Sequence, residues 1–180
     1  MDLEGIYRKT GPNSQLRGIM VHLSKGDIPD LIDSEEFSDI ASITSILKLY
    51  LRELPDPLLT YELYPRFIDV MDLTTEEERI KAMAGVIAQL PSVNKKTLKC
   101  LCDHLIRVGA QSDVNLMTFK NLAVVFGPTL MRSADPDREF LDMGAKNAVV
   151  EFILKHSARL FPNAASKPPS QESFYGDVAV

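Results

Sequence analysis

The chain has 180 residues, of which 45% are hydrophobic and 25% are charged, a balance typical of soluble globular proteins. A chain of this length can bury roughly 70% of the surface that it exposes when unfolded, which is enough for one domain with its own core. The net charge of −5 argues against a nucleic-acid-binding protein, and no apolar run reaches the ~18 residues that a membrane span requires. The only cysteines, Cys100 and Cys102, are too close in sequence to suggest a disulfide framework, so we expect a reducing, cytoplasmic setting.

Helical periodicity predicts that residues 1–161 form one all-α domain. Apolar residues recur with a period near 3.6 through most of this range, and sustained polar–apolar alternation, which is typical of strands, does not occur. After a loop over residues 1–12, we expect a bundle of about seven helices near 14–24, 38–53, 60–73, 75–90, 92–108, 118–127 and 142–160. Residues 162–180 contain three prolines and little that a core could bury, so they are expected to form a disordered tail.

Capping residues and prolines define several of these bounds. The N-caps that we expect are Ser14, Thr75 (in a capping box with Glu78) and Thr118. The prolines in residues 54–57 and 127–128 are expected to end helices, because proline removes a backbone donor and disfavours helix in the residue before it. The helix at 38–53 is apolar around most of its circumference, which predicts a central place in the bundle.

Arg8 is the first residue that a plain helical bundle does not explain. It lies in the segment EGIYRKTG, where Gly5 and Gly11 permit tight turns and close approach of the backbone to a partner. From spacing alone, the ordinary interpretation is a solvated surface arginine. The alternative is an arginine presented to another molecule.

Lys48 and Arg52 are the second such feature. They lie four residues apart on a narrow polar stripe of the 38–53 helix, together with Thr44 and Ser45. Like charges at this spacing repel each other on a helix. Either an anion or a set of backbone carbonyls compensates them, or both side chains extend along the apolar surface with solvated heads.

Asn121 is the third, because it sits between Phe119 and the apolar run of residues 122–126. An asparagine on so apolar a helix is expected to be buried or at an interface, where its amide needs hydrogen-bond partners. Two roles remain open: an internal hydrogen bond that fixes a neighbouring loop, or recognition of another protein.

A metal site is not expected, although Cys100, Cys102 and His104 lie close in sequence. On a helix, Cys102 points away from the other two, so both cysteines are expected in the core. We expect no nucleotide site in the chain itself, because no phosphate-cradling glycine motif occurs. With no recognisable nucleophile–base pair either, an enzyme with a complete site of its own is not expected.

Four segments together resemble the Rho GTPase-activating family, also called RhoGAP or breakpoint-cluster-homology domains. They occur in the family's order and spacing over residues 4–161, and four in register are far more specific than one alone. The segments are EGIYRKTG, LKLYLRELPDPLLT, LPSVNKKTLKCLCDHL and NLMTFKNLAVVFGPTLMR.

The resemblance implies a GTPase-activating protein for GTP-bound Rho-family small GTPases. Arg8 would be the arginine finger, inserted in trans into a catalytic site that belongs to the GTPase. Of the basic pair, Arg52 would brace the finger loop and Lys48 would face the GTPase, while Asn121 would hydrogen-bond at the GTPase surface. The chain itself would need no cofactor or metal, since GTP and Mg²⁺ belong to the partner, and any recruitment to membranes would come through partners.

One departure from the family pattern concerns the N-terminus. Family members usually have a further helix before the finger loop, whereas only Met1-Asp2-Leu3 precede it here. We expect lower stability and a less firmly held Arg8 as a result, so the alternative function is a catalytically impaired fragment that acts only as a binding module. The ending Val178-Ala179-Val180 has the pattern of a weak PDZ ligand.

Overall fold

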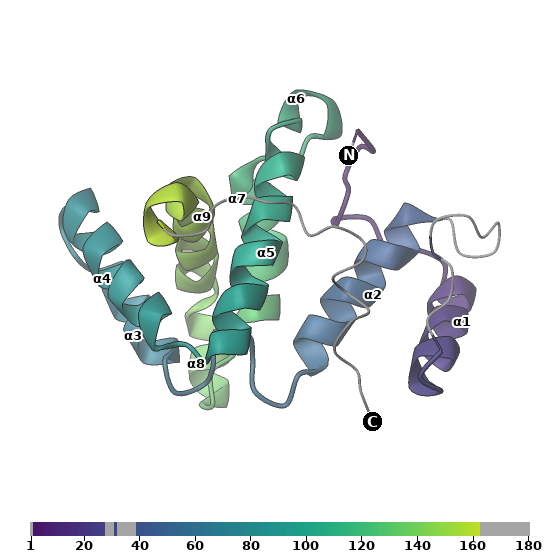
Figure 1. Ribbon diagram of the computed structural model, residues 1–180, viewed down its shortest axis with the longest axis horizontal. Helices are drawn as coiled ribbons and strands as arrows, with labels where there is room; N and C mark the ends of the chain where they lie inside the picture. Colours follow the sequence, from purple (N-terminus) through teal and green to yellow (C-terminus); the bar gives the residue numbers. More distant parts are fainter. Residues whose placement is uncertain (1, 28–30, 32–38, 163–180) are drawn as a thin grey trace.

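The computed structural model describes residues 2–27, 31 and 39–162, and within these residues the chain is all-α, with nine helices and no strand (Figure 1). The helices are α1 (Asn13–Ser24), α2 (Ile40–Glu53), α3 (Tyr64–Val70), α4 (Glu76–Gln89), α5 (Ser92–Gly109), α6 (Ser112–Asn115), α7 (Phe119–Leu130), α8 (Pro136–Leu141) and α9 (Met143–Leu160). None of these helices is long and apolar enough to cross a lipid bilayer. The predicted tail over residues 162–180, apart from Pro162, and the predicted PDZ ligand lie outside the described residues.

Side-chain caps begin two of the helices as local sequence predicts. Thr75 and Glu78 form the reciprocal capping box at the start of α4, and Thr118 accepts from the backbone N–H of Asn121 at the start of α7. The start of α1 was predicted wrongly. Its cap is Pro12, whose carbonyl accepts from Leu16 at 3.2 Å, so the helix begins before Ser14 and uses no side-chain cap.

The third predicted helix is shorter than expected. Thr60 has φ of 57°, which is outside the helical region, and its hydroxyl accepts from the backbone N–H of Leu63 at 3.3 Å. This turn delays the helix, so α3 covers only Tyr64–Val70. The segment before it behaves as predicted, because α2 ends at Glu53, directly before the proline-rich turn.

The predicted stop at Gly127-Pro128 is wrong, because α7 continues through Pro128 to Leu130. A proline at this position leaves the carbonyl of Val124 without its helical donor. Val124 is exposed, so water can reach that side of the helix, and continuing the helix buries Leu130. The short helices α6 and α8 were not predicted, since segments of four and six residues carry too little periodicity to be recognised.

The core forms around α5, α7 and α9, and α7 and α9 make the most extensive helix–helix contact. The prediction that the 38–53 helix is central is wrong: α2 lies between α7 and α1, and its Tyr50 is 64% exposed. In Figure 1, α1 lies at one side of the molecule and α3 and α4 at the other. A small second cluster around Ile19 and Ile46 joins α1 to α2.

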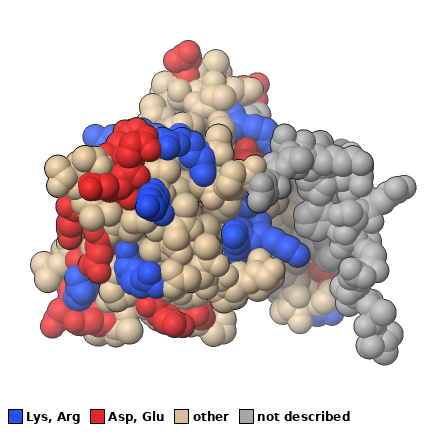
Figure 2. Space-filling model, turned by 60° about the vertical axis from the view of Figure 1, so that its left-hand side comes forward, with Lys and Arg blue, Asp and Glu red and all other residues tan. Residues whose placement is uncertain are grey.

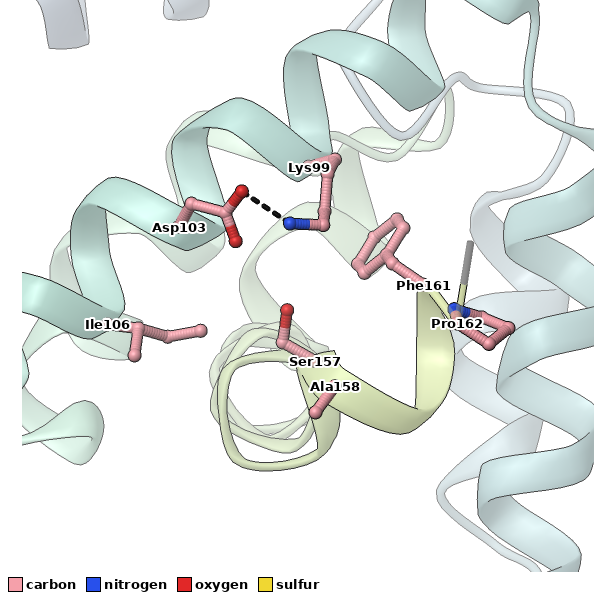
Figure 3. A pocket seen from close by; sticks show the side chains of 7 residues that line it. All are labelled: Lys99, Asp103, Ile106, Ser157, Ala158, Phe161 and Pro162. Atoms are coloured by element: carbon pink, nitrogen blue, oxygen red, sulfur yellow. Dashed lines mark hydrogen bonds and ion pairs between the residues drawn. The ribbon is translucent and has the colours of Figure 1, made fainter. Parts of the chain in front are cut away.

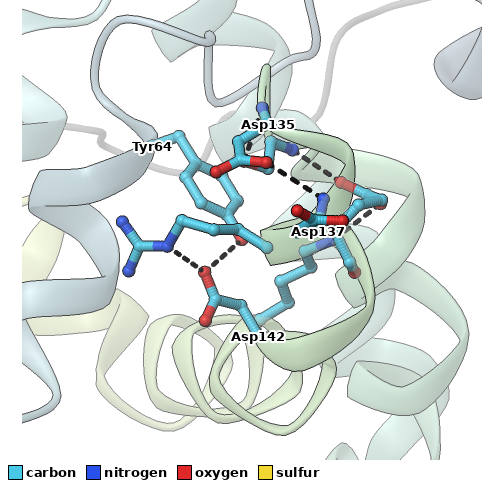
Figure 4. Close-up of polar contacts among 8 residues, drawn as sticks. Tyr64, Asp135, Asp137 and Asp142 are labelled. Carbon is cyan, nitrogen blue, oxygen red and sulfur yellow. Dashed lines mark hydrogen bonds and ion pairs between the residues drawn. The ribbon is translucent and has the colours of Figure 1, made fainter.

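A polar cluster joins α8 to α9 and α3 (Figure 4). Lys146 is fully buried; its Nζ forms an ion pair with Glu139 Oε1 at 2.6 Å, donates to the Glu139 carbonyl at 2.9 Å, and lies 5.8 Å from the centre of the Tyr64 ring. The Tyr64 hydroxyl donates to Asp142 at 3.1 Å, and Arg138 pairs with the same carboxylate. These contacts hold α8, which buries none of its own residues.

Candidate functional site

The N-terminal loop, residues 2–12, closes on itself around Gly5 and is tied to the turn before α7. Gly5 has φ of +71°, and its N–H donates to the carbonyl of Asn115 at 2.8 Å. Its own carbonyl accepts from the N–H groups of Arg8 at 2.8 Å and Lys9 at 3.0 Å. A positive φ is a conformation that glycine adopts without steric cost. This part of the loop is therefore a tight turn, attached to the bundle through the bond from Gly5 to Asn115.

Gly11 fixes the other end of this loop against the start of α2. A Cβ atom at Gly11 would lie 2.1 Å from the Ser42 hydroxyl and 2.5 Å from the Ser42 backbone nitrogen. Ser42 cannot move aside easily, because its N–H and hydroxyl both donate to the capping carboxylate of Asp39 at 2.8 and 2.7 Å. Glycine is thus required here by close packing.

Tyr7 is the main anchor of the loop. Its side chain is buried and its ring packs edge-on against Phe126 of α7 and His104 of α5, with centroid separations of 5.1 and 5.7 Å. Its hydroxyl hydrogen-bonds to His104 Nε2 at 2.6 Å, and its carbonyl accepts from Lys48 Nζ of α2. Tyr7 has φ of 70°, a strain of order 1–3 kcal/mol for such a residue, which these contacts offset.

The titration of the Tyr7–His104 pair favours one protonation pattern. Burial raises the pKa of Tyr7 to about 12, so the hydroxyl keeps its proton and can donate. Burial, with the charge of Arg107 next in importance, lowers the pKa of His104, which favours the neutral imidazole. We therefore assign Nε2 as the acceptor and place the ring hydrogen on Nδ1.

Arg8 follows directly after this anchor, and its side chain is exposed. The guanidinium folds back over Gly5, where an added Cβ would lie 3.3 Å from Arg8 Nη2. Within the described residues it makes no side-chain hydrogen bond or ion pair, whereas the neighbouring Lys9 faces Glu4 at 3.9 Å. The loop thus holds its backbone firmly and leaves one cation uncommitted.

The contacts of Lys48 and Arg52 on α2 differ from those that the resemblance implied. Lys48, not Arg52, contacts the N-terminal loop, through the Tyr7 carbonyl. Burial, followed by the charge of Arg52, lowers the pKa of Lys48. The Arg52 side chain is exposed and has no hydrogen bond or ion pair to any described residue. Of the predicted polar stripe, Thr44 and Ser45 are buried and so do not extend this exposed surface.

Arg132 clamps the end of α2, a role that sequence reasoning missed. Its Nη1 donates to the carbonyl of Arg52 at 2.5 Å, its Nη2 donates to the carbonyl of Leu54, and the guanidinium lies 5.6 Å from the centre of the Tyr61 ring. A cation at a helix C-terminus meets unpaired carbonyls and the negative end of the helix dipole. Its place just after α7 and its charge were the only sequence signals.

Asn121 is exposed, so of the two places expected for its amide the core is excluded, and the interface stays a prediction. Its Nδ2 donates to the carbonyl of Leu116 at 2.8 Å, so the internal hydrogen bond to a neighbouring loop exists. The buried amide is instead Asn115, which donates to the Val108 carbonyl and accepts from the Met117 N–H, both at 2.8 Å. Asn121 therefore supports the same turn whose Asn115 carbonyl holds the N-terminal loop.

The cysteines lie apart from this site, and one of them departs from the expected burial. Cys102 is buried, and its surroundings raise its pKa to about 12, chiefly through burial. Cys100 is exposed, which contradicts the prediction of two core cysteines. No group of three or more potential metal ligands occurs among the described residues, and His104 is engaged with Tyr7.

A hollow of about 290 Å³ lies between α5 and the end of α9 (Figure 3). Lys99 and Asp103 are paired with each other at its edge. The lining residues belong to α5, to the last turns of α9 and to Phe161 and Pro162 directly after it, and the N-terminal loop contributes none. The surface charge is mixed, as Figure 2 shows patches of both signs on one face, so that face does not resemble a nucleic-acid interface.

Comparison with known proteins places the sequence in a family. The model of the RhoGAP domain matches residues 1–135. "Probable Rho-type GTPase-activating protein 4" of Schizosaccharomyces pombe is 40% identical over 89% of this chain and 17% of its own length. Rho GTPase-activating protein 30 of Homo sapiens is 36% identical over 95% of this chain and 16% of its own length. The chain thus spans less than a fifth of the length of either relative.

Solved structures agree with this assignment. The crystal structure of human Rho GTPase activating protein 15 superimposes with a TM-score of 0.84 at 30% identity, covering 89% of this chain and 76% of that chain. The BH domain of GRAF, the GTPase regulator associated with focal adhesion kinase, gives a TM-score of 0.77 at 33% identity over 89% of this chain and 85% of that chain. Sequence and fold together establish that this chain belongs to the RhoGAP domain family.

Proposed function

We propose that this chain activates Rho-type GTPases by presenting Arg8 in trans to GTP bound by the partner. The observation that carries the proposal is the contrast within the N-terminal loop. Its backbone is fixed at Gly5, Tyr7 and Gly11, while the Arg8 guanidinium is exposed and unpaired among the described residues. The relatives' names, which describe Rho GTPase-activating proteins, support the choice of partner class.

The chemistry suits an arginine. Charge builds on the oxygens of the phosphoryl group as it leaves GTP, and a guanidinium offers a permanent positive charge with a planar fork of donors. Such fingers accelerate hydrolysis roughly 10³–10⁵-fold, almost entirely by position and electrostatics. GTP and Mg²⁺ are held by the GTPase, so we assign no cofactor to this chain, and recruitment to a membrane would come through partners.

We assign the exposed residues near the loop to contact with the GTPase. Asn121 and Val124 lie three residues apart on one face of α7, and both are exposed. Leu116, whose carbonyl Asn121 fixes, is 48% exposed at the turn before α7. Arg52 adds an exposed cation on α2 that has no partner among the described residues. Lys48 is assigned to support of the loop, because it is bound to the Tyr7 carbonyl.

The test is single-turnover GTP hydrolysis by purified Rho-, Rac- and Ras-class GTPases, with and without this chain. We expect acceleration of a Rho-class protein, no effect on the Ras-class protein, and loss of roughly 10³-fold or more of the acceleration in Arg8→Ala. Arg159→Ala is the matched control. It removes another exposed arginine, one paired with Glu77 at 2.7 Å, and should leave the rate unchanged.

Two results would contradict the proposal in different ways. If the wild-type chain binds a GTP-loaded Rho-class protein without accelerating hydrolysis, the chain is a binding module. If Arg8→Ala accelerates hydrolysis as well as wild type, the finger is another residue. The free energies of unfolding of Arg8→Ala and Arg159→Ala are expected to lie within about 0.5 kcal/mol of the wild-type value, because exposed side chains contribute little to stability.

A further inference from the structure

We propose that Tyr7 and His104 act as a positioning pair for Arg8, and that their hydrogen bond sets the maximum rate of GTP hydrolysis without contributing to GTPase affinity. This inference rests on the proposed function of Arg8. Neither residue reaches the partner in this assignment, because Tyr7 is buried and His104 faces it from α5. They would act only through the backbone that carries the guanidinium.

The first reason lies in the backbone next to Arg8. Tyr7 occupies a positive φ, which a bulky residue leaves unless its surroundings hold it there. A change of Tyr7 back towards the ordinary region would redirect the peptide that enters Arg8. The direction of the Arg8 side chain therefore depends on whatever holds Tyr7.

The second reason is that two of the contacts of Tyr7 are directional. Packing against Phe126 fixes the depth of the ring, but packing alone is non-directional. The 2.6 Å bond from the hydroxyl to His104 Nε2 and the bond from Lys48 to the Tyr7 carbonyl are directional. One bond holds the side-chain hydroxyl and the other holds the backbone carbonyl, so together they define the orientation of Tyr7.

The third reason is the rigidity of the anchor. His104 lies on α5, an 18-residue helix with neighbours Leu101, Cys102 and Leu105 in the core. A fixed position matters for a finger, because a misplacement of about 1 Å can cost on the order of 10²-fold in rate. The pair transmits the position of this core helix to an exposed loop.

The experiment combines Tyr7→Phe, His104→Leu, the double variant and His104→Gln in single-turnover hydrolysis by a Rho-class GTPase. Tyr7→Phe keeps the ring and removes only the hydroxyl, and a glutamine oxygen can replace Nε2 as acceptor. We expect Tyr7→Phe and His104→Leu each to lower the maximum rate about tenfold. The double variant should lose no more than the worse single variant, and His104→Gln should recover much of the rate.

Affinity and a matched control separate positioning from general damage. Affinity for the GTPase loaded with a non-hydrolysable GTP analogue should stay within about twofold of wild type. Tyr64→Phe makes the same chemical change at a buried tyrosine bonded to Asp142, away from the loop, and should leave the rate unchanged. Melting curves would establish that each variant is folded at the assay temperature.

The Arg8→Ala background distinguishes the two proposals. If Arg8→Ala slows hydrolysis and the added Tyr7→Phe slows it no further, the pair acts through Arg8 as proposed. If Arg8→Ala slows hydrolysis but Tyr7→Phe and His104→Leu keep the wild-type rate, the positioning inference is wrong, whereas the proposed role of Arg8 is supported. If Arg8→Ala itself has no effect, the proposed function is wrong. If the losses of rate in Tyr7→Phe and His104→Leu add up when the two changes are combined, the inference is also overturned.

Discussion

Two cations in this molecule have opposite surroundings. Arg8 is exposed, has no side-chain partner among the described residues, and sits on a strained loop. Lys146 is fully buried, binds both the carboxylate and the carbonyl of Glu139, and lies near the Tyr64 ring (Figure 4). In Figure 1 the N-terminal loop lies near α6, whereas α8 lies towards the opposite end of the bundle.

The difference shows that a charged side chain with internal partners serves folding, whereas one without them is available for another role. A buried charge must be compensated inside the molecule, so Lys146 is committed to holding α8. An unpaired exposed charge contributes little to stability. At Gly5 and Tyr7, however, the backbone next to the exposed charge is held rigidly. This fixed backbone defines where the charged side chain lies. Variants at the two ends should therefore affect different measurements.

The largest effect on stability is expected from Glu139→Gln. It leaves Lys146 buried without a counter-charge, which should lower the free energy of unfolding by about 1–3 kcal/mol, measured by urea denaturation. The control is Glu151→Gln, whose partner Lys155 is about half exposed and whose loss should cost at most about 0.5 kcal/mol. The rate of GTPase activation per folded molecule should not change in either. A slower rate in Glu139→Gln would break the separation between the two ends.

A smaller effect, on rate, is expected from Lys48→Met. Methionine keeps the apolar stem but cannot donate to the Tyr7 carbonyl, so we expect the maximum rate to fall about tenfold while GTPase affinity is kept. Lys155→Met is the matched control at an exposed ion pair. The opposite pattern, weaker binding with an unchanged maximum rate, would mean that Lys48 contacts the GTPase, as the family resemblance implied.

The smallest effect is expected in the pH dependence of stability. Because the pKa of His104 in the folded protein lies below its ordinary value near 6.5, the unfolded chain binds more protons as pH falls through this range. The contribution of His104 is therefore fully present above about pH 7.5 and is lost as pH falls through 6.5 and below. Melting temperatures at pH 5 and 7.5 should differ more for wild type than for His104→Gln. An equal difference would show that His104 titrates normally.

Much of the fold could be predicted from local sequence, because caps and prolines act over a few residues. The Thr75–Glu78 capping box and the end of α2 before Pro55 are examples. The continuation of α7 through Pro128 could not be predicted in this way. It depends on the burial of Leu130 and on an exposed face at Val124, and both are properties of the assembled bundle.

The site was predicted in the same uneven way. Arg8 stands out by its place between two glycines and by the family resemblance. Tyr7 and Asn115 did not stand out, and His104 drew notice only as a possible metal ligand, since their roles arise from contacts with residues about a hundred positions away. The contact of Lys48, rather than Arg52, with the N-terminal loop has a similar cause. Spacing places both on one helix, but only the packed loop determines which one meets the Tyr7 carbonyl.

The long-range attachments of the N-terminal loop have a consequence for how the chain folds. Residues 2–12 are synthesised roughly a hundred residues before their partners His104, Asn115 and Phe126. Loop closure over such separations is slow, and long-range contacts form after local helices. The exposed arginine therefore acquires its orientation only when the helices of the core have docked, so that a nascent or half-folded chain carries Arg8 without the orientation that the proposed function requires.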